Sequence, residues 1–165
     1  NLAMRTFFNM LGPMANPANP AFQLVGVYNL EMARIYNYLL QLGGRPFTII
    51  HSLDGYDEIS LTSDTKVITH EGERVMTPEQ LGKRMVMAED ISGGNTVEEA
   101  AAIFRKILNG EGSWAQNAVV LANAAMALHC TGKYPSYDEA YNAAVQSLES
   151  GKARRGLELL IGFQE

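Results

Sequence analysis

The sequence predicts an α/β fold, part of a mostly parallel sheet with flanking helices, in a single domain of 165 residues. The first observation is the order of elements: a strand at 23–28, a helix at 30–42 and a strand at 47–52 form one right-handed unit with parallel strands. The second is the segment 47–52 itself, whose apolar residues do not alternate with polar ones, as in strands buried on both faces. The third is a C-terminal half rich in helix start signals.

The elements before residue 77 are bounded by capping and turn residues. Asn29 is expected to cap the first helix, and Gly43 and Gly44 are expected to end it. Three shorter segments follow the strand at 47–52, and we expect them to be strands at an edge of the sheet, with a hairpin turn at 70–73. These segments are 59–61, 66–69 and 74–76.

The chain from residue 77 onward is expected to be helical. Four Ser or Thr residues each precede a Gln or Glu by three positions, which is the capping-box pattern of a helix start. The helix after the third of them is apolar around most of its circumference, so it should be central. A last helix from Tyr137 to Ser150 should break at Gly151 and resume at 153–161. The four capping residues are Thr77, Thr96, Ser113 and Ser136.

Charge and composition exclude several classes of function. The formal net charge is −5 and most Lys and Arg residues are scattered, which argues against nucleic acid as a partner. No apolar run approaches the ~20 residues that a membrane span needs, so no membrane partner is expected. The single cysteine, Cys130, cannot form an internal disulfide, which fits a reduced, cytoplasmic setting.

Two adjacent carboxylates, Asp57 and Glu58, follow the buried strand at 47–52 after a turn at Asp54 and Gly55. The carboxyl ends of strands are where ligands bind in open α/β sheets. Neighbouring carboxylates repel each other unless a cation or hydrogen-bond donors compensate them, and Mg²⁺ is typically held by one or two carboxylates plus substrate phosphates. The residues alone therefore leave two interpretations open, a magnesium site and a solvated acidic loop.

Four segments resemble one enzyme family. Residues 5–18 read Arg-Thr-Phe-Phe-Asn-Met-Leu-Gly-Pro-Met-Ala-Asn-Pro-Ala, and residues 54–60 read Asp-Gly-Tyr-Asp-Glu-Ile-Ser. They resemble the Arg-Thr-x-Phe-Asn-x-Leu-Gly-Pro-x-x-Asn-Pro-Ala and Asp-Gly-x-Asp-Glu-x-Ser segments of the anthranilate phosphoribosyltransferases. Residues 117–125 and 150–153 resemble the C-terminal helices of that family. The resemblance covers essentially the whole chain in the same order.

The resemblance implies an enzyme of tryptophan biosynthesis that moves a 5-phosphoribosyl group from phosphoribosyl pyrophosphate to the amino group of anthranilate and releases pyrophosphate. It implies a helical domain followed by an α/β domain, and a homodimer for the full-length enzyme. Asp57 and Glu58 match the acidic pair that holds magnesium on the pyrophosphate, and Arg5 matches the arginine that faces the anthranilate carboxylate. It implies no covalent nucleophile, and we assign no catalytic residue in this chain.

Two segments of the family pattern do not occur in this sequence. They are the Gly-Thr-Gly-Gly-Asp loop that binds phosphoribosyl pyrophosphate and a Lys-His-Gly-Asn segment at the anthranilate entrance. The glycine cluster at 92–95 follows no buried strand, so we interpret it as a linker. We therefore expect the C-terminal part of the α/β catalytic domain, inactive alone, without the N-terminal helical domain and first strands. Its uncovered sheet edge should pair with the other half or with a second copy.

Two alternative functions remain. A relative similar to pyrimidine nucleoside phosphorylases would use free phosphate, and the segment 5–18 together with the paired carboxylates argues against it. A non-catalytic paralogue that binds nucleic acid is the other alternative. The acidic metal-binding pair and the net negative charge argue against that one.

Overall fold

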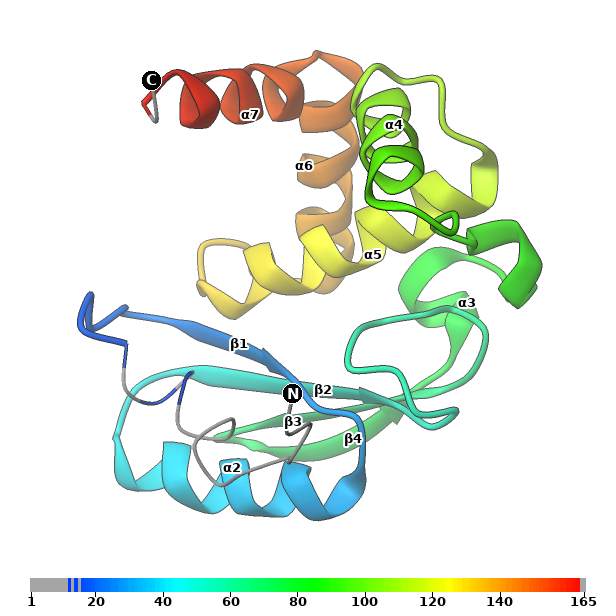
Figure 1. The fold of residues 1–165 in the computed structure, drawn as a ribbon. Coiled ribbons are helices and arrows are strands. Elements are labelled where there is room, and N and C mark those ends of the chain that lie inside the picture. The colour runs from blue at the N-terminus through cyan, green and yellow to red at the C-terminus, as the bar shows by residue number, and fades with distance from the viewer. Residues whose placement is uncertain (1–11, 13, 15, 164–165) are drawn as a thin grey trace, which may run out of the picture.

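The computed structural model describes residue 12, residue 14 and residues 16–163. The first elements are β1 (Gln23–Gly26), α2 (Leu30–Leu42) and β2 (Phe47–Ser52), which form the predicted βαβ unit (Figure 1). Asn29 caps α2 as expected, because its side chain accepts a hydrogen bond from the Met32 backbone N–H at 2.8 Å. The strands β3 (Thr65–Thr69) and β4 (Gly72–Met76) follow and complete the sheet.

The four described strands are ordered β1-β2-β3-β4 in a mixed sheet. β1 runs parallel to β2 with Val25 opposite Ile49, whereas β2 pairs with β3 and β3 with β4 in antiparallel fashion. The expectation of a mostly parallel sheet is therefore wrong for these strands. The reason is the connections: residues 53–64 contain no crossover helix and β3 turns directly into β4, so each strand returns antiparallel to the one before.

The predicted strand at 59–61 is absent among the described strands, although its apolar side chains are buried as a strand's would be. Ile59 and Leu61 are both 0% exposed. The two backbone groups of Ile59 are hydrogen-bonded to the side chain of Asn123, and the Leu61 carbonyl accepts from the Val86 N–H at 3.0 Å. A side chain and a loop thus take the place of a neighbouring strand, and this substitution cannot be read from apolar spacing.

The chain after residue 77 is helical, as predicted. Thr77, Thr96, Ser113 and Ser136 each precede a helix. Reciprocal capping boxes form at Thr77 and Ser113, whereas Glu99 bonds the N–H of Asn95 instead of that of Thr96. The helices are α3 (Pro78–Gly82), the 3₁₀ helix η1 (Ala88–Ile91), α4 (Val97–Leu108), α5 (Trp114–Cys130), α6 (Tyr137–Glu149) and α7 (Lys152–Gly162).

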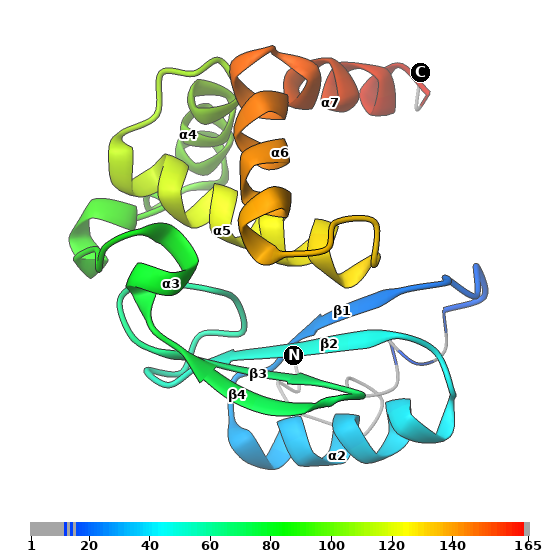
Figure 2. The same cartoon turned by 180° about the vertical axis from the view of Figure 1, so that it is seen from behind.

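Helices cover both faces of the sheet, and each face has its own apolar cluster (Figures 1 and 2). One cluster packs α2 against the sheet and includes Tyr36, Phe47 and Ile49. The other packs α5 and α6 on the opposite face and includes Ala122 and Met126. α5 is central, as its apolar circumference predicted. None of the helices in the described part of the chain is long and apolar enough to cross a membrane.

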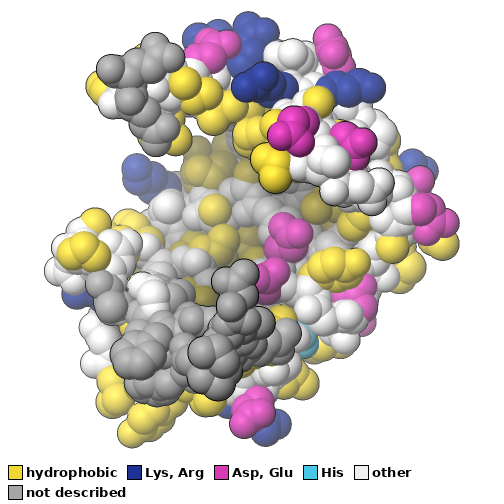
Figure 3. All heavy atoms as spheres, in the orientation of Figure 1, with side chains coloured by type: hydrophobic (Ala, Val, Ile, Leu, Met, Phe, Trp, Pro, Cys, Tyr) yellow, Lys and Arg dark blue, Asp and Glu magenta, His cyan; other side chains and the backbone are white. Residues whose placement is uncertain are grey.

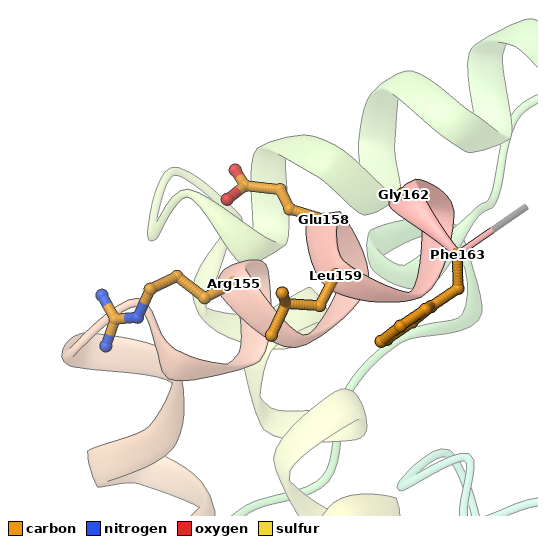
Figure 4. A pocket seen from close by; sticks show the side chains of 5 residues that line it. All are labelled: Arg155, Glu158, Leu159, Gly162 and Phe163. Carbon is orange, nitrogen blue, oxygen red and sulfur yellow. The ribbon is translucent and has the colours of Figure 1, made fainter. Parts of the chain in front are cut away.

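The helix α7 turns away from α6 at Gly151, which has a φ of 70° (Figure 1). Several of its apolar side chains are exposed to solvent. Leu159 and Phe163 are 65% and 86% exposed. They point to the same side of α7 and line a shallow pocket of about 480 Å³ together with Arg155, Glu158 and Gly162 (Figure 4). Figure 3 shows this face of the molecule hollowed between the upper helices and the sheet, with hydrophobic side chains inside the hollow.

Candidate functional site

Asp57 and Glu58 lie in the loop that leaves β2, at the end of the sheet where the carboxyl ends of β1 and β2 are side by side. Both residues are exposed. Gly55 forms the turn before them with a φ of 102°, a conformation that favours glycine. The structure thus has the acidic pair beyond the carboxyl end of β2, where the sequence predicted it.

The backbone of Asp57 lies directly against the last residue of β1. A β-carbon added at Gly26 would stand 2.7 Å from the carbonyl carbon of Asp57 and nearer still to its oxygen. Any larger residue at this position would displace the loop. Gly26 therefore acts as a spacer that lets the loop carrying both carboxylates close over the sheet.

Ser52, the last residue of β2, fixes the loop from below. Its hydroxyl donates to the Glu58 carbonyl at 2.7 Å and accepts from the Ser60 N–H at 3.2 Å. A further hydroxyl, that of Thr65, lies 3.3 Å away, and both Ser52 and Thr65 are fully buried. These bonds join the beginning and the end of the loop at a dry position, where hydrogen bonds are strong and specific.

Asp54 has a different role from its two acidic neighbours. Its carboxylate accepts a hydrogen bond from the Thr62 hydroxyl, with the Ser60 hydroxyl 3.5 Å away. Asp54 therefore closes the turn, as its position before Gly55 predicted. Among the described residues, the other carboxylates of this loop, those of Asp57, Glu58 and Asp64, form no ion pair, and Asp57 and Glu58 are the two that are adjacent in the chain.

A clamp from α5 holds the residue that follows the acidic pair. The Asn123 side-chain oxygen accepts from the Ile59 N–H at 3.0 Å, and its Nδ2 donates to the Ile59 carbonyl at 2.8 Å. Nδ2 also donates to the Val119 carbonyl one turn earlier, at 3.0 Å. The loop is thus tied to the helical half of the fold as well as to the sheet.

The electrostatics of the pair favour a cation. Although the Glu58 residue is exposed, protein atoms around its carboxyl group remove part of the hydration, and this desolvation raises the pKa of Glu58; the negative charge of Asp57 raises that pKa further. In the described part of the chain neither carboxylate forms an ion pair with Lys, Arg or His. A divalent cation would relieve the repulsion between the two side chains and stabilise the charged form of Glu58.

The donor set fits magnesium shared with a substrate and does not fit a metal held by protein alone. Two adjacent carboxylates are hard oxygen ligands of the kind Mg²⁺ prefers. Within residues 16–163, however, no group of three or more His, Cys, Asp or Glu side chains is arranged to hold a metal ion. The remaining ligands would have to come from water and from phosphate oxygens.

Other polar residues of interest have structural partners. The buried His51 places Nδ1 2.8 Å from the Val27 carbonyl and so links β2 to the residue that follows β1. His129 and Cys130 are adjacent in α5, but His129 faces the Tyr134 carbonyl at 3.2 Å and Cys130 the Gln23 carbonyl at 3.5 Å. They bond to different segments and do not form a joint site.

Sequence reasoning named Asp57 and Glu58 but missed the residues that hold them. Arg5, the third predicted site residue, lies outside the described residues. Gly26 did carry a signal, because an isolated glycine inside a strand segment often marks a close approach of another backbone, but the signal does not say which residue approaches. The sequence also carried a signal at Asn123. This polar residue stands between two apolar runs, 118–122 and 124–128, in a helix predicted to be central, and a polar side chain in such a place needs a hydrogen-bond partner.

Comparison with known proteins shows a family match over most of the chain and relatives that are anthranilate phosphoribosyltransferases. Residues 1–154 match the family model described as glycosyl transferase family, a/b domain. The anthranilate phosphoribosyltransferase of Flavobacterium johnsoniae is 54% identical over 159 residues, which are 96% of this chain and 48% of the relative. That of Bacteroides fragilis is 48% identical over 160 residues, 97% of this chain and 48% of the relative. The chain thus spans about half the length of the curated relatives it matches.

Solved structures agree with this. The crystal structure of anthranilate phosphoribosyltransferase from Thermus thermophilus is similar with a TM-score of 0.86 and 31% identity, over 98% of this chain and 48% of that one. The Saccharomyces cerevisiae enzyme in complex with PRPP and Mg has a TM-score of 0.82 and 25% identity, over 94% and 45%. The family model covers nearly the whole sequence, and the α/β architecture agrees with it, so the chain belongs to the glycosyl transferase family, a/b domain.

Proposed function

We propose that this chain is the C-terminal part of the α/β catalytic domain of an anthranilate phosphoribosyltransferase. The complete protein would transfer the 5-phosphoribosyl group of phosphoribosyl pyrophosphate to the amino group of anthranilate and release pyrophosphate. The observation that carries the proposal is the acidic pair, Asp57 and Glu58, held at the carboxyl ends of β1 and β2. The relatives described above, which are all named for this activity, support it.

Asp57 and Glu58 would hold magnesium on the pyrophosphate of the substrate. The two side chains are exposed, adjacent and free of ion pairs among the described residues, so they can accept a cation that also binds phosphate oxygens. When bound, Mg²⁺ supplies positive charge that stabilises the departing pyrophosphate. The backbone bonds of Ser52 and Asn123 would keep the loop in place during the reaction.

Arg5 would bind the second substrate. A planar guanidinium can meet the carboxylate of anthranilate with two parallel N–H bonds, which fixes the amino group relative to the ribose. The C–N bond to anthranilate forms as the C–O bond to pyrophosphate breaks, so the transfer needs no covalent intermediate on the protein. The support for Arg5 is the resemblance of residues 5–18 alone.

The chain would be inactive alone, since the Gly-Thr-Gly-Gly-Asp loop that binds the phosphates is not in this sequence. The outer edge of β1 has no partner among the described strands, and α7 exposes Leu159 and Phe163. In the complete enzyme, a cytoplasmic homodimer in our proposal, the other half would extend the sheet beyond β1 with parallel strands. Expressed separately, the chain would self-associate through the outer edge of β1 and the exposed apolar side chains at α7.

The test is a fluorescence assay of anthranilate consumption with the full-length protein, phosphoribosyl pyrophosphate and Mg²⁺. We expect consumption that depends on all three, and none with residues 1–165 alone. Parallel assays with pyrimidine nucleosides plus phosphate, and a gel-shift assay with DNA at several salt concentrations, address the two alternatives. Nucleoside cleavage or salt-dependent DNA binding without anthranilate consumption would contradict the proposal.

A further inference from the structure

We propose that Asn123 is a positioning residue for the magnesium-binding pair. It would hold Asp57 and Glu58 in the arrangement that binds the metal, although Asn123 itself contacts neither carboxylate. The inference rests on the proposed function, because it assigns Asn123 a part in the metal site proposed there. Its support is the geometry of the backbone immediately after Glu58.

The side-chain amide of Asn123 satisfies both backbone hydrogen-bonding groups of Ile59. Its oxygen accepts from the Ile59 N–H at 3.0 Å and its nitrogen donates to the Ile59 carbonyl at 2.8 Å. This pairing is what a neighbouring strand would provide, delivered by a single side chain. It fixes the orientation of the peptide unit between Glu58 and Ile59, and hence the direction in which the Glu58 side chain leaves the loop.

The clamp also has a firm base. The second N–H of Nδ2 donates to the Val119 carbonyl at 3.0 Å, so the amide cannot rotate without losing a bond. The preceding residue, Ala122, is 0% exposed, and its carbonyl lies 3.1 Å from the hydroxyl of Tyr137. That hydroxyl lies 2.7 Å from the Leu81 carbonyl, which joins α6, α5 and α3 at this point.

Three elements therefore contact three consecutive residues of the loop, two of them through hydrogen bonds. Gly26 of β1 permits the close approach of Asp57, Ser52 of β2 donates to the Glu58 carbonyl, and Asn123 of α5 holds Ile59. The first two come from the sheet on which the loop stands. Asn123 contributes the contact from the opposite side, so its loss should leave the loop attached at its base and free to tilt.

Replacing a residue that orients a metal ligand through a hydrogen bond typically lowers metal affinity by 10- to 100-fold. Asn123→Ala removes both bonds to Ile59, whose backbone is buried. Asn123→Asp keeps the shape and the acceptor but places an oxygen opposite the Ile59 carbonyl oxygen, where repulsion replaces the 2.8 Å hydrogen bond. We expect both variants to lose metal affinity.

The experiment measures Mn²⁺ binding to the full-length protein by electron paramagnetic resonance of the free ion, with phosphoribosyl pyrophosphate present to supply the phosphate ligands and without anthranilate, so that no transfer occurs. A blank without protein corrects for the Mn²⁺ that phosphoribosyl pyrophosphate binds in solution. The matched control is Asn117→Ala, since Asn117 also lies on α5 and donates to a backbone carbonyl, that of Gly112 at 3.3 Å, away from the acidic loop. Asn123→Ala should weaken Mn²⁺ binding about 10- to 100-fold, and Asn117→Ala should leave it unchanged. Hydrogen exchange of the Ile59 amide without metal should accelerate in Asn123→Ala alone.

Asp57→Asn and Glu58→Gln, measured in the same assay, separate a failure of the proposed metal site from a failure of the proposed role of Asn123. If they weaken Mn²⁺ binding and folded Asn123→Ala does not, the role of Asn123 is wrong and the metal site stands. If neither carboxylate variant changes the affinity, the metal site is wrong and the role of Asn123 falls with it. Should Asn123→Ala be unfolded by its melting curve, Asn123→Asp decides by the same criterion, and normal Mn²⁺ affinity in that variant overturns the inference.

Discussion

Gly26 and Asp57 stand so close that the hydrogen on the Gly26 α-carbon is the largest group the space allows. A β-carbon there would lie 2.7 Å from the Asp57 carbonyl carbon. The contact joins the last residue of β1 to the first residue of the acidic pair, across 30 residues of chain that include α2 and β2. The backbone of the loop thus lies directly against β1, although the carboxylates that the loop carries are exposed.

Gly26→Ala should therefore displace the loop and weaken the metal site. We expect a loss of about 1–3 kcal/mol in the free energy of unfolding, as for other overpacked positions, together with a higher Mg²⁺ requirement. The control is Gly156→Ala on α7, where a β-carbon meets nothing within 4 Å and replaces glycine in a helix interior. Denaturant melts and Mg²⁺ titrations of both variants check this. Equal behaviour of the two variants would contradict a close contact at Gly26.

Arg5→Ala in the full-length protein should raise the KM for anthranilate by roughly one to two orders of magnitude. The loss of a charge-assisted pair, about 1.5–3 kcal/mol, gives this figure. The KM for phosphoribosyl pyrophosphate and the melting temperature should change little. Arg5→Lys should restore the KM only in part, because an ammonium group cannot form two parallel bonds. Equal increases in both KM values with a lowered melting temperature would mean that Arg5 supports the fold instead.

The raised pKa of Glu58 predicts the pH dependence of metal binding. Burial raises this pKa first and the charge of Asp57 second, so the folded protein holds the Glu58 proton at a pH where the unfolded chain has released it. Charged Glu58 therefore destabilises the metal-free fold above its folded pKa, and this penalty disappears as the pH falls through that pKa. Magnesium must compete with the proton in the same window.

Mg²⁺ affinity should consequently begin to fall at a higher pH than an ordinary glutamate would cause. Glu58→Gln should flatten that part of the profile and stabilise the metal-free protein at neutral pH. Calorimetric Mg²⁺ titrations and thermal melts across the acidic range, with and without metal, measure both effects. Wild-type affinity that stays constant down to the ordinary range of glutamate would show that the raised pKa plays no part.

Local signals predicted much of the fold. The Asn29 cap and the four later helix starts depend on residues within a few positions of each other, and all are present. The parallel pairing of β1 with β2 joins residues 24 positions apart, but it follows from the local strand, helix and strand signals and the handedness rule for such units. The central position of α5 followed from its apolar circumference. The position of Asp57 and Glu58 followed from the end of β2, which is also a local feature.

Features that depend on distant residues were missed. The segment 59–61 was predicted to be a strand because apolar Ile59 and Leu61 alternate with a polar residue, but the partner of Ile59 is Asn123, 64 residues away. A glycine inside an apolar strand indicates that another backbone comes close, but it does not identify Asp57, which lies 31 positions further along the chain, as the residue that approaches Gly26. The antiparallel direction of β3 follows from the loop 53–64, which contains no crossover helix. We did not predict from the sequence of this loop that the chain would turn back along β2.

The central claim is that Asp57 and Glu58 bind magnesium for the transfer reaction. It is tested most directly by Mg²⁺ titrations of turnover in full-length Asp57→Asn and Glu58→Gln, with Glu98→Gln, an exposed carboxylate of α4, as the control. Both site variants should lose several orders of magnitude in turnover at limiting Mg²⁺ and recover in part at high Mg²⁺, with the KM for anthranilate little changed, because the lost ligand weakens metal affinity first. Near-normal turnover of both variants across the whole titration would contradict the claim.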